Sequence, residues 1–149
     1  MSEKALEVFI DGVLNYFKHT SDNKIKVGAP YLHNNTEPAT LDYTGIIGVS
    51  GSYKGVVYFT APKVLLTHLL LSLGESDTSM ENIADLIGEV ANTISGNARS
   101  EFGQNFMISV PTVARGRLSE AHVPQALRSY VIPIYWKSYN AAVVVCLEQ

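Results

Sequence analysis

The sequence predicts an α/β fold of the α+β kind, a two-layer domain with long helices packed on a mostly antiparallel sheet of about five to six strands. Segments with helical periodicity alternate with short runs rich in Val, Ile, Tyr and Phe. Turn residues separate several of these runs closely enough for hairpins. No fixed-period repeat or low-complexity tract interrupts the pattern, so residues 1–149 are expected to form one domain.

Composition excludes several classes of function. With 149 residues, of which 46% are hydrophobic, the chain is long enough to build its own core. The chain has 11 Lys and Arg against 14 Asp and Glu, which gives a net charge of −3. A nucleic-acid-binding protein is expected to have an excess of basic residues instead. The single cysteine, Cys146, cannot form an internal disulfide and is expected to be a buried core thiol.

The N-terminal segment does not look like a secretion signal, because Glu3, Glu7 and Asp11 interrupt its apolar residues. The longest apolar runs fall far short of the ~20 residues that cross a bilayer. We therefore expect a soluble, cytoplasmic protein without a membrane partner.

The first third of the chain predicts one helix and one strand. Residues 2–18 place apolar side chains at three- and four-residue steps, and Ser2 is a candidate N-cap. Residues 24–32 alternate like a strand but are broken by Gly28 and Pro30, and a loop is expected before residue 43.

The middle of the chain predicts a hairpin followed by two helices. The runs 43–51 and 53–61 are expected to pair around Gly51 and Ser52. Pro62 suits the first turn of the next helix and Gly74 its end. A longer helix should follow, running to about Phe102. Its candidate caps are Asp77, Thr78 and Ser79, with Gly103 closing it.

The last third predicts three more strands, at 106–116, 130–138 and 140–148. Pro111 and Pro133 interrupt the first two of them. These prolines are expected at bulges, at edges or at positions without a ladder hydrogen bond.

The long helix contains the stretch DLIGEVANTISGNA, residues 85–98, which carries a polar stripe opposite its apolar face. Successive residues turn by about 100°, so a stripe within about 60° of Glu89 holds Asn82, Asp85, Asn92 and Gly96. The arc expected to pack on the sheet holds Ile83, Ile87, Val90, Ala91, Ile94 and Ala98.

Polar residues are ordinary on a solvent-facing helix, but the glycines of this helix are not. Gly88 and Gly96 each cost about 1 kcal/mol in a helix interior, so a purely structural face would more often carry Ala, Lys or Glu. Glycine removes side chains that would block an approaching molecule. Access to the stripe is therefore a reason for keeping them.

Glu89 and Asn92 together suit the positioning of a water molecule. An amide is not a general base near neutral pH, but its oxygen accepts and its NH2 donates hydrogen bonds, so it can hold water at a fixed angle. A carboxylate one turn away can pair with a cation and fix the register of docking. This combination is useful where another molecule already activates the electrophile.

These residues resemble the signature of the chemotaxis phosphatases CheC, CheX and FliY, in which D-x-x-x-E-x-x-N is followed by G-N-A. The signature is carried here by Asp85, Glu89, Asn92, Gly96, Asn97 and Ala98. The likeness extends over most of the chain. CheC carries two such motifs, whereas the first helix here has no E-x-x-N, so the single site resembles the CheX branch.

The resemblance implies a phosphatase that dephosphorylates the response regulator CheY, whose aspartyl phosphate is held with Mg²⁺ in CheY itself. It implies that Glu89 pairs with the active-site lysine of CheY and that Asn92 orients water for in-line attack. Asp85, Gly88, Gly96 and Asn97 are expected at the partner-binding surface, and the chain needs no cofactor of its own. CheX-type proteins also imply a homodimer joined through a shared sheet, for which the Val-rich strand 140–147 is a candidate edge.

The sequence disfavours two alternative functions and leaves a third open. A metal enzyme needs more ligands than Asp85 and Glu89, and the four histidines form no H-x-x-x-H or H-E-x-x-H pattern. A serine hydrolase would need a G-x-S-x-G elbow, and the nearest stretch of this sequence, residues 48–51, matches it poorly. The nearest alternative is a non-enzymatic chemotaxis or flagellar-switch adaptor that binds a CheY-like partner without hydrolysis.

Overall fold

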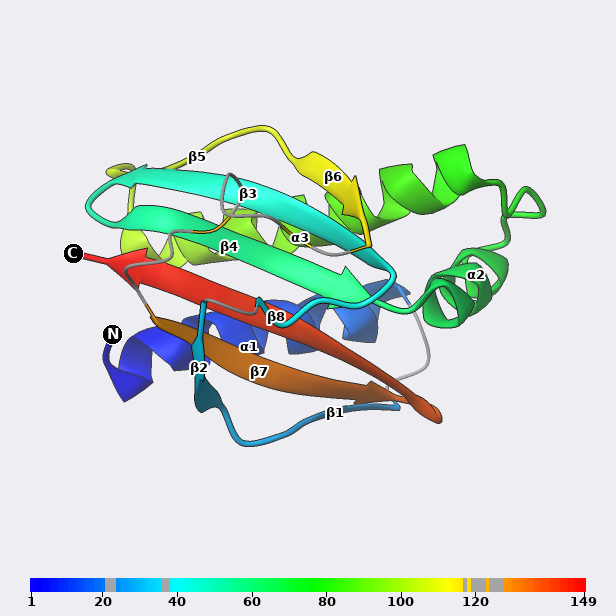
Figure 1. Ribbon diagram of the computed structural model, residues 1–149, viewed down its shortest axis with the longest axis horizontal. Helices are drawn as coiled ribbons and strands as arrows, with labels where there is room; N and C mark the ends of the chain where they lie inside the picture. The colour runs from blue at the N-terminus through cyan, green and yellow to red at the C-terminus, as the bar shows by residue number, and fades with distance from the viewer. Residues whose placement is uncertain (21–23, 36–37, 117, 119–122, 124–127) are drawn as a thin grey trace.

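The computed structural model describes residues 1–20, 24–35, 38–116, 118, 123 and 128–149. Within these residues, three helices, α1 (Glu3–Thr20), α2 (Lys63–Ser72) and α3 (Met80–Phe102), accompany one antiparallel sheet. The strands are β1 (Ile25–Val27), β2 (Tyr31–Asn34), β3 (Tyr43–Gly51), β4 (Lys54–Ala61), β5 (Phe106–Ile108), β6 (Thr112–Arg115), β7 (Arg128–Trp136) and β8 (Tyr139–Glu148). Figure 1 shows α1 and α3 behind the sheet and α2 beyond one end of it.

The predicted fold class is confirmed, but the described residues form a sheet of eight strands where the sequence predicted five to six. The difference arises because two predicted strands are each divided. Residues 24–32 form β1 and β2, separated at Gly28–Pro30, and both pair with β7. Residues 106–116 form β5 and β6, separated around Pro111, and both pair with β3.

The two prolines occupy the positions that their chemistry allows. Pro111 lies in the break between β5 and β6. Pro133 lies inside β7, where its carbonyl accepts a 2.9 Å hydrogen bond from the Gly28 amide. In a strand the N and C=O of one residue point to the same side, so the missing N–H of Pro133 faces the gap between β1 and β2.

The sheet order is β1-β7-β8-β4-β3-β5, which corrects the expectation for residues 140–147. The prediction that this Val-rich strand lies at an edge is wrong, because β8 pairs with β7 on one side and β4 on the other. Its residues Ala141–Cys146 are buried without interruption. A continuous apolar run of this kind is typical of a strand covered on both faces.

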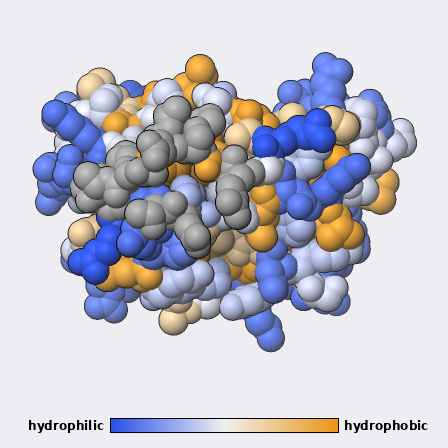
Figure 2. Space-filling view, viewed as in Figure 1, coloured by the Kyte–Doolittle hydropathy of each residue, from blue (hydrophilic) through white to orange (hydrophobic). Residues whose placement is uncertain are grey.

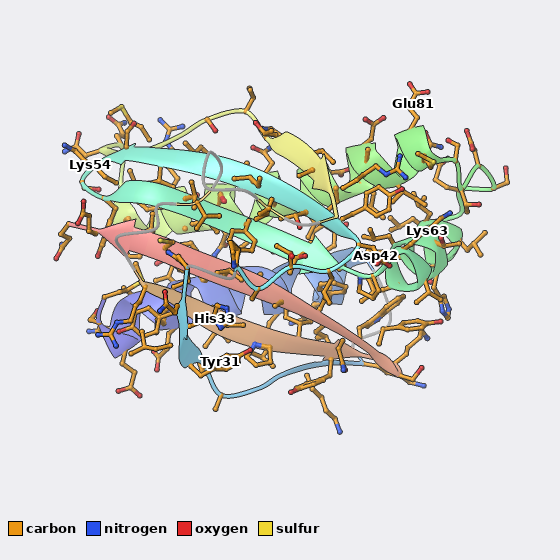
Figure 3. The ribbon with its side chains drawn as sticks, in the orientation of Figure 1. Tyr31, His33, Asp42, Lys54, Lys63 and Glu81 are labelled. Carbon is orange, nitrogen blue, oxygen red and sulfur yellow. The ribbon has the colours of Figure 1, made fainter. Side chains whose placement is uncertain are left out.

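The helix ends confirm the predicted caps. Ser2 Oγ accepts a hydrogen bond from the Ala5 amide at 3.1 Å, and Ser79 Oγ accepts from the Asn82 amide at 3.3 Å. Gly103 closes α3 with a φ of +98°, which favours glycine. At the start of α2, Asp42 Oδ2 accepts from the Lys63 amide at 2.8 Å, and Figure 3 shows the two residues side by side.

The main core lies between the helices and the sheet. A smaller apolar cluster, which includes Ile46, Tyr58, Val144 and Cys146, lies on the other face of the sheet. Figure 2 shows this face, where hydrophobic and hydrophilic residues are interspersed. Cys146 is fully buried, as predicted, and its sulfur accepts a 3.1 Å hydrogen bond from Asn35 Nδ2. Burial raises the pKa of the Tyr58 hydroxyl, which keeps it neutral.

Gly45 on β3 sets how closely α3 approaches the sheet. A Cβ atom there would lie 2.5 Å from the Ile87 carbonyl oxygen and 3.1 Å from the Ala91 Cβ. The contact with the carbonyl oxygen is closer than real Cβ atoms come to a neighbour, and the contact with Ala91 is tighter than most Cβ contacts. Any side chain at this position would push α3 away from β3.

We therefore predict that Gly45→Ala lowers the free energy of unfolding by about 1–3 kcal/mol, the usual cost of overpacking a core. Gly48→Ala in the same strand is the control, because its Cβ would meet only Ser109, with Oγ at 3.4 Å. Urea denaturation followed by circular dichroism measures both variants. Equal stability of the two variants would contradict the assignment of Gly45 as a contact point for α3.

Candidate functional site

The predicted core face of α3 is confirmed, and it decides which side chains point outward. Ile83, Ile87, Val90 and Ala98 are fully buried, and Ala91 and Ile94 are 1% exposed. Helix α3 packs against β3, β4, β5, α1 and α2. Because the apolar arc is fixed against these elements, the polar stripe must lie on the opposite side of the helix.

Asp85, Glu89 and Asn92 all lie exposed on that stripe. None of the three side chains forms a hydrogen bond or an ion pair with any residue that the structure describes. Asn92 is therefore not sequestered beneath the strands of its own sheet. The donors and acceptors of all three side chains remain available to another molecule.

Asp85 and Glu89 form a like-charge pair at i and i+4. Such a pair destabilises a helix by roughly 0.2–0.5 kcal/mol. The neighbours of Glu89 at three and four residues are Asp85, Leu86, Asn92 and Thr93, and none of them is cationic. The pair thus works against the helix in the isolated chain, and a cation from another molecule would relieve the repulsion.

A shallow depression of about 280 Å³ lies beside Glu89, between α3 and the end of α2. Its apolar wall is formed by Leu70, Leu73 and Leu86. The polar wall consists of Glu75, Asn82, Asp85 and Glu89. A lysine side chain fits this chemistry, since its methylene stem can lie on leucine while its ammonium group meets carboxylates.

Gly96 and Gly88, both predicted to open the surface for a partner, differ in the structure. A Cβ on Gly96 would meet nothing within 4 Å, so the packing of the chain itself does not require glycine there. Gly88 is buried, and its Cβ would lie 3.4 Å from Val113 Cγ2 and 3.5 Å from Pro111 Cγ. Gly88 therefore lies under β6 and the segment before it, and does not belong to the exposed stripe.

Asn97 lies at the boundary between α3 and α1. It is half-buried, and its Nδ2 donates to the Val8 carbonyl at 3.5 Å. Gly12 on α1 faces Asn97, and a Cβ there would lie 3.4 Å from Asn97 Nδ2, at the close end of ordinary van der Waals contact. Asn97 thus joins two helices at the side of the stripe.

The positions of the possible metal ligands bear on the alternative of a metal enzyme. Among the described part of the chain, no three His, Cys, Asp or Glu side chains are grouped so that they could hold a metal ion. His19 bonds to the Asn15 carbonyl at 2.8 Å, and His68 bonds to the Tyr139 hydroxyl at 3.2 Å. His122 lies outside the described residues. No described helix is long and apolar enough to cross a membrane.

The sequence did not predict the side of the depression that α2 and the turn after it provide. Leu70, Leu73 and Glu75 come from α2 and the turn after it, and no spacing in the sequence relates them to α3. One signal was present in the sequence, because the α2 segment is apolar on nearly all sides. In the structure, Leu71 near the end of α2 and Leu73 just after it are 54% and 40% exposed. Exposed leucines at a helix end indicate a surface that is not explained by the core alone.

The family model described as chemotaxis phosphatase CheX matches residues 43–135, well over half of the chain and all of the polar stripe. The chain belongs to the CheX family. No match was found among curated proteins.

Solved structures of CheX-like and CheC-like proteins have the same fold. A CheC-like superfamily protein from Shewanella sp. PV-4 is 26% identical over 100% of both chains, with a TM-score of 0.84. Chemotaxis protein CheX from Vibrio vulnificus is 23% identical over 97% of this chain and 99% of its own, with a TM-score of 0.80. The CheX–CheY–BeF3–Mg²⁺ complex from Borrelia burgdorferi is 18% identical over 97% and 98%, with a TM-score of 0.78.

For this CheX-family protein, Gly96→Ala should raise the free energy of unfolding by about 0.5–1 kcal/mol, because alanine is the better helix former and its methyl group meets no obstacle. Gly103→Ala is the control. Its Cβ also meets nothing within 4 Å, but its φ of +98° strains any other residue. Chemical denaturation should therefore show opposite signs for the two variants, and a destabilised Gly96→Ala would contradict the prediction.

Proposed function

We propose that the chain is a protein phosphatase that hydrolyses the aspartyl phosphate of CheY or a CheY-like receiver domain. The observation that carries the proposal is the exposure of Glu89 and Asn92 on one face of α3, with neither side chain paired within the described chain. Membership of the CheX family supports it. A role as a binding adaptor alone would leave the free amide of Asn92 without a purpose.

In this proposal, Glu89 fixes the register of docking. Its carboxylate receives the active-site lysine of the receiver, whose stem lies along the leucines of the depression beside it. Asp85, in the same depression, adds negative charge that favours the lysine. Gly96 lets the backbone of the receiver approach α3 closely because no side chain projects there.

Asn92 positions the attacking water. Its amide enters the phosphorylation site and holds one water in line with the bond to be broken. The water oxygen bonds to phosphorus, and the bond from phosphorus to the aspartyl oxygen breaks, with its electron pair staying on the carboxylate. The products are the free carboxylate and dihydrogen phosphate, which keeps both protons of the water.

The chain needs no general base for this step, because an acyl phosphate already has a good leaving group. Phosphoryl transfer depends mainly on positioning and on neutralisation of charge. Mg²⁺ and the lysine belong to the receiver in this proposal, which is consistent with the Borrelia complex, where CheX and CheY occur together with BeF3 and Mg²⁺. Glu89 and Asn92 add the docking contact and the aligned water.

The proposal includes a homodimer joined edge to edge through the sheet. Since β8 is internal, the edges available among the described strands are β1 and β2 at one end and β5 and β6 at the other. All four are short, and an edge strand can extend its sheet by pairing with a strand of a second copy.

Asn92→Ala should lower the turnover of phosphorylated receiver by ~10²-fold or more while leaving binding largely intact, as expected for loss of a water-positioning group. Release of inorganic phosphate measures turnover, and calorimetry with the BeF3-loaded receiver measures binding. Asn15→Ala is the control, because Asn15 is also an exposed helical asparagine, but on α1. Turnover of Asn92→Ala equal to wild type would reject the catalytic assignment.

Glu89→Ala should weaken docking as well as turnover, because the lysine of the receiver loses its carboxylate partner. We expect the dissociation constant for the BeF3-loaded receiver to rise by about tenfold. Glu101→Ala, which removes an exposed carboxylate from another side of α3, should bind like wild type. If wild-type protein binds the receiver but does not accelerate its dephosphorylation, the adaptor function replaces this proposal.

A further inference from the structure

Arg99 lies on the same side of α3 as the polar stripe, two turns after Asn92. Seven residues rotate the helix by about 700°, which leaves Arg99 only ~20° from Asn92 and ~10.5 Å further along the axis. The side chain is exposed and lines a depression of about 450 Å³ together with Gly96, Ser100, Gly103, Gln104 and Ile108. The guanidinium group therefore emerges beside β5, at the C-terminal end of the stripe.

The charge of Arg99 is not matched within the described chain. Its helical neighbours at three and four residues are Ser95, Gly96, Phe102 and Gly103, none of which is acidic. Its side chain makes no hydrogen bond or ion pair with any described residue. Glu101, the nearest acid in sequence, lines a different depression with Asp11 and Lys18.

The outer face of α3 consequently has negative charge in its first half and positive charge in its second. Glu81, Asp85 and Glu89 are exposed before Asn92, and Arg99 is exposed after it. Figure 3 shows Glu81 projecting from the first turn of α3, away from the sheet. Glu89 and Arg99 are separated by about 15 Å along the axis. A partner that matches both charges can lie along the helix in one direction only.

We propose that Arg99 is a second docking residue, which binds a carboxylate on the surface of the receiver domain and thereby fixes the orientation of the receiver on α3. This inference rests on the proposed function. A guanidinium group forms paired hydrogen bonds with a carboxylate, which gives direction as well as attraction. The axial offset from Asn92 and the position beside β5 put this contact outside the phosphorylation site.

The position of Arg99 near the end of α3 suggests another reason for an arginine at this site. A cation in the last turn stabilises a helix through its dipole, and Arg99 is the basic residue of that turn. That effect belongs to the chain alone and would appear as a change in stability. A docking role would instead appear in the KM for the receiver, so the two explanations are separable.

The test measures kcat and KM for the phosphorylated receiver with Arg99→Gln, Arg99→Glu and Arg99→Lys. We expect Arg99→Gln to raise KM by about 3- to 5-fold and Arg99→Glu by at least about tenfold, with kcat unchanged. Arg99→Lys should retain most of the affinity. The differences should shrink between about 0.1 M and 1 M NaCl, since salt screens an exposed pair.

Arg128→Gln is the matched control, because Arg128 is an exposed arginine on β7, away from α3. It should keep the wild-type KM. Unchanged KM in Arg99→Glu would overturn the proposal. A fall in kcat at constant KM would also overturn it, since the guanidinium would then act on the phosphoryl group. The proposal would also be overturned if Arg99→Gln lost enough stability to account for the rise in KM.

Binding to the receiver loaded with BeF3 and Mg²⁺ separates this inference from the proposed function. If wild-type protein does not accelerate dephosphorylation, the proposed function fails, and the dissociation constants of the Arg99 variants still test docking. Replacing receiver carboxylates with lysine one at a time completes the experiment. One such variant should restore binding to Arg99→Glu, and restoration by none of them would overturn the proposal.

Discussion

The contact between Gly45 on β3 and the Ile87 carbonyl of α3 is the constraint on which the arrangement of the site depends. It lets the helix backbone lie almost directly on the strand, and the buried arc of α3 then has one rotational setting. Burying a side chain such as Ile83 or Ile87 contributes about 1.5–3 kcal/mol. A rotation of α3 that turned Asn92 inward would expose several such side chains, so the outward direction of the amide follows from the core.

This anchoring allows the outer face of α3 to carry residues that do not favour a helix. Gly96 costs about 1 kcal/mol, and the Asp85–Glu89 repulsion costs roughly 0.2–0.5 kcal/mol. Each cost is smaller than the contribution of one buried isoleucine. The face can therefore be shaped for another molecule without loss of the fold. Glu89 and Asn92 are exposed and pair with no residue in the described part of the chain, which leaves this face open to another molecule.

Local chemistry explains which parts of this structure could be predicted from sequence. Helix ends depend on nearby residues such as Ser79 and Gly103, and the polar stripe depends on helical spacing alone. The order of strands depends on distant pairing. Nothing local to residues 140–147 states that β4 and β7 flank them. The burial of Gly88 escaped prediction for the same reason, because the segment that covers it, at Pro111, follows only after the whole of α3 and β5.

The geometry of α3 also bears on how a protein with the proposed function would select its partner. In that proposal, an amide that aligns water would act on any acyl phosphate it could reach, so Asn92 alone would not distinguish one receiver from another. Discrimination would then come from groups that meet the partner away from phosphorus. A carboxylate and a guanidinium of opposite sign, separated by about 15 Å on one rigid helix, supply both a position and a direction. Because α3 holds all three groups in one element, the proposed function would make correct docking and correct alignment of the water the same event.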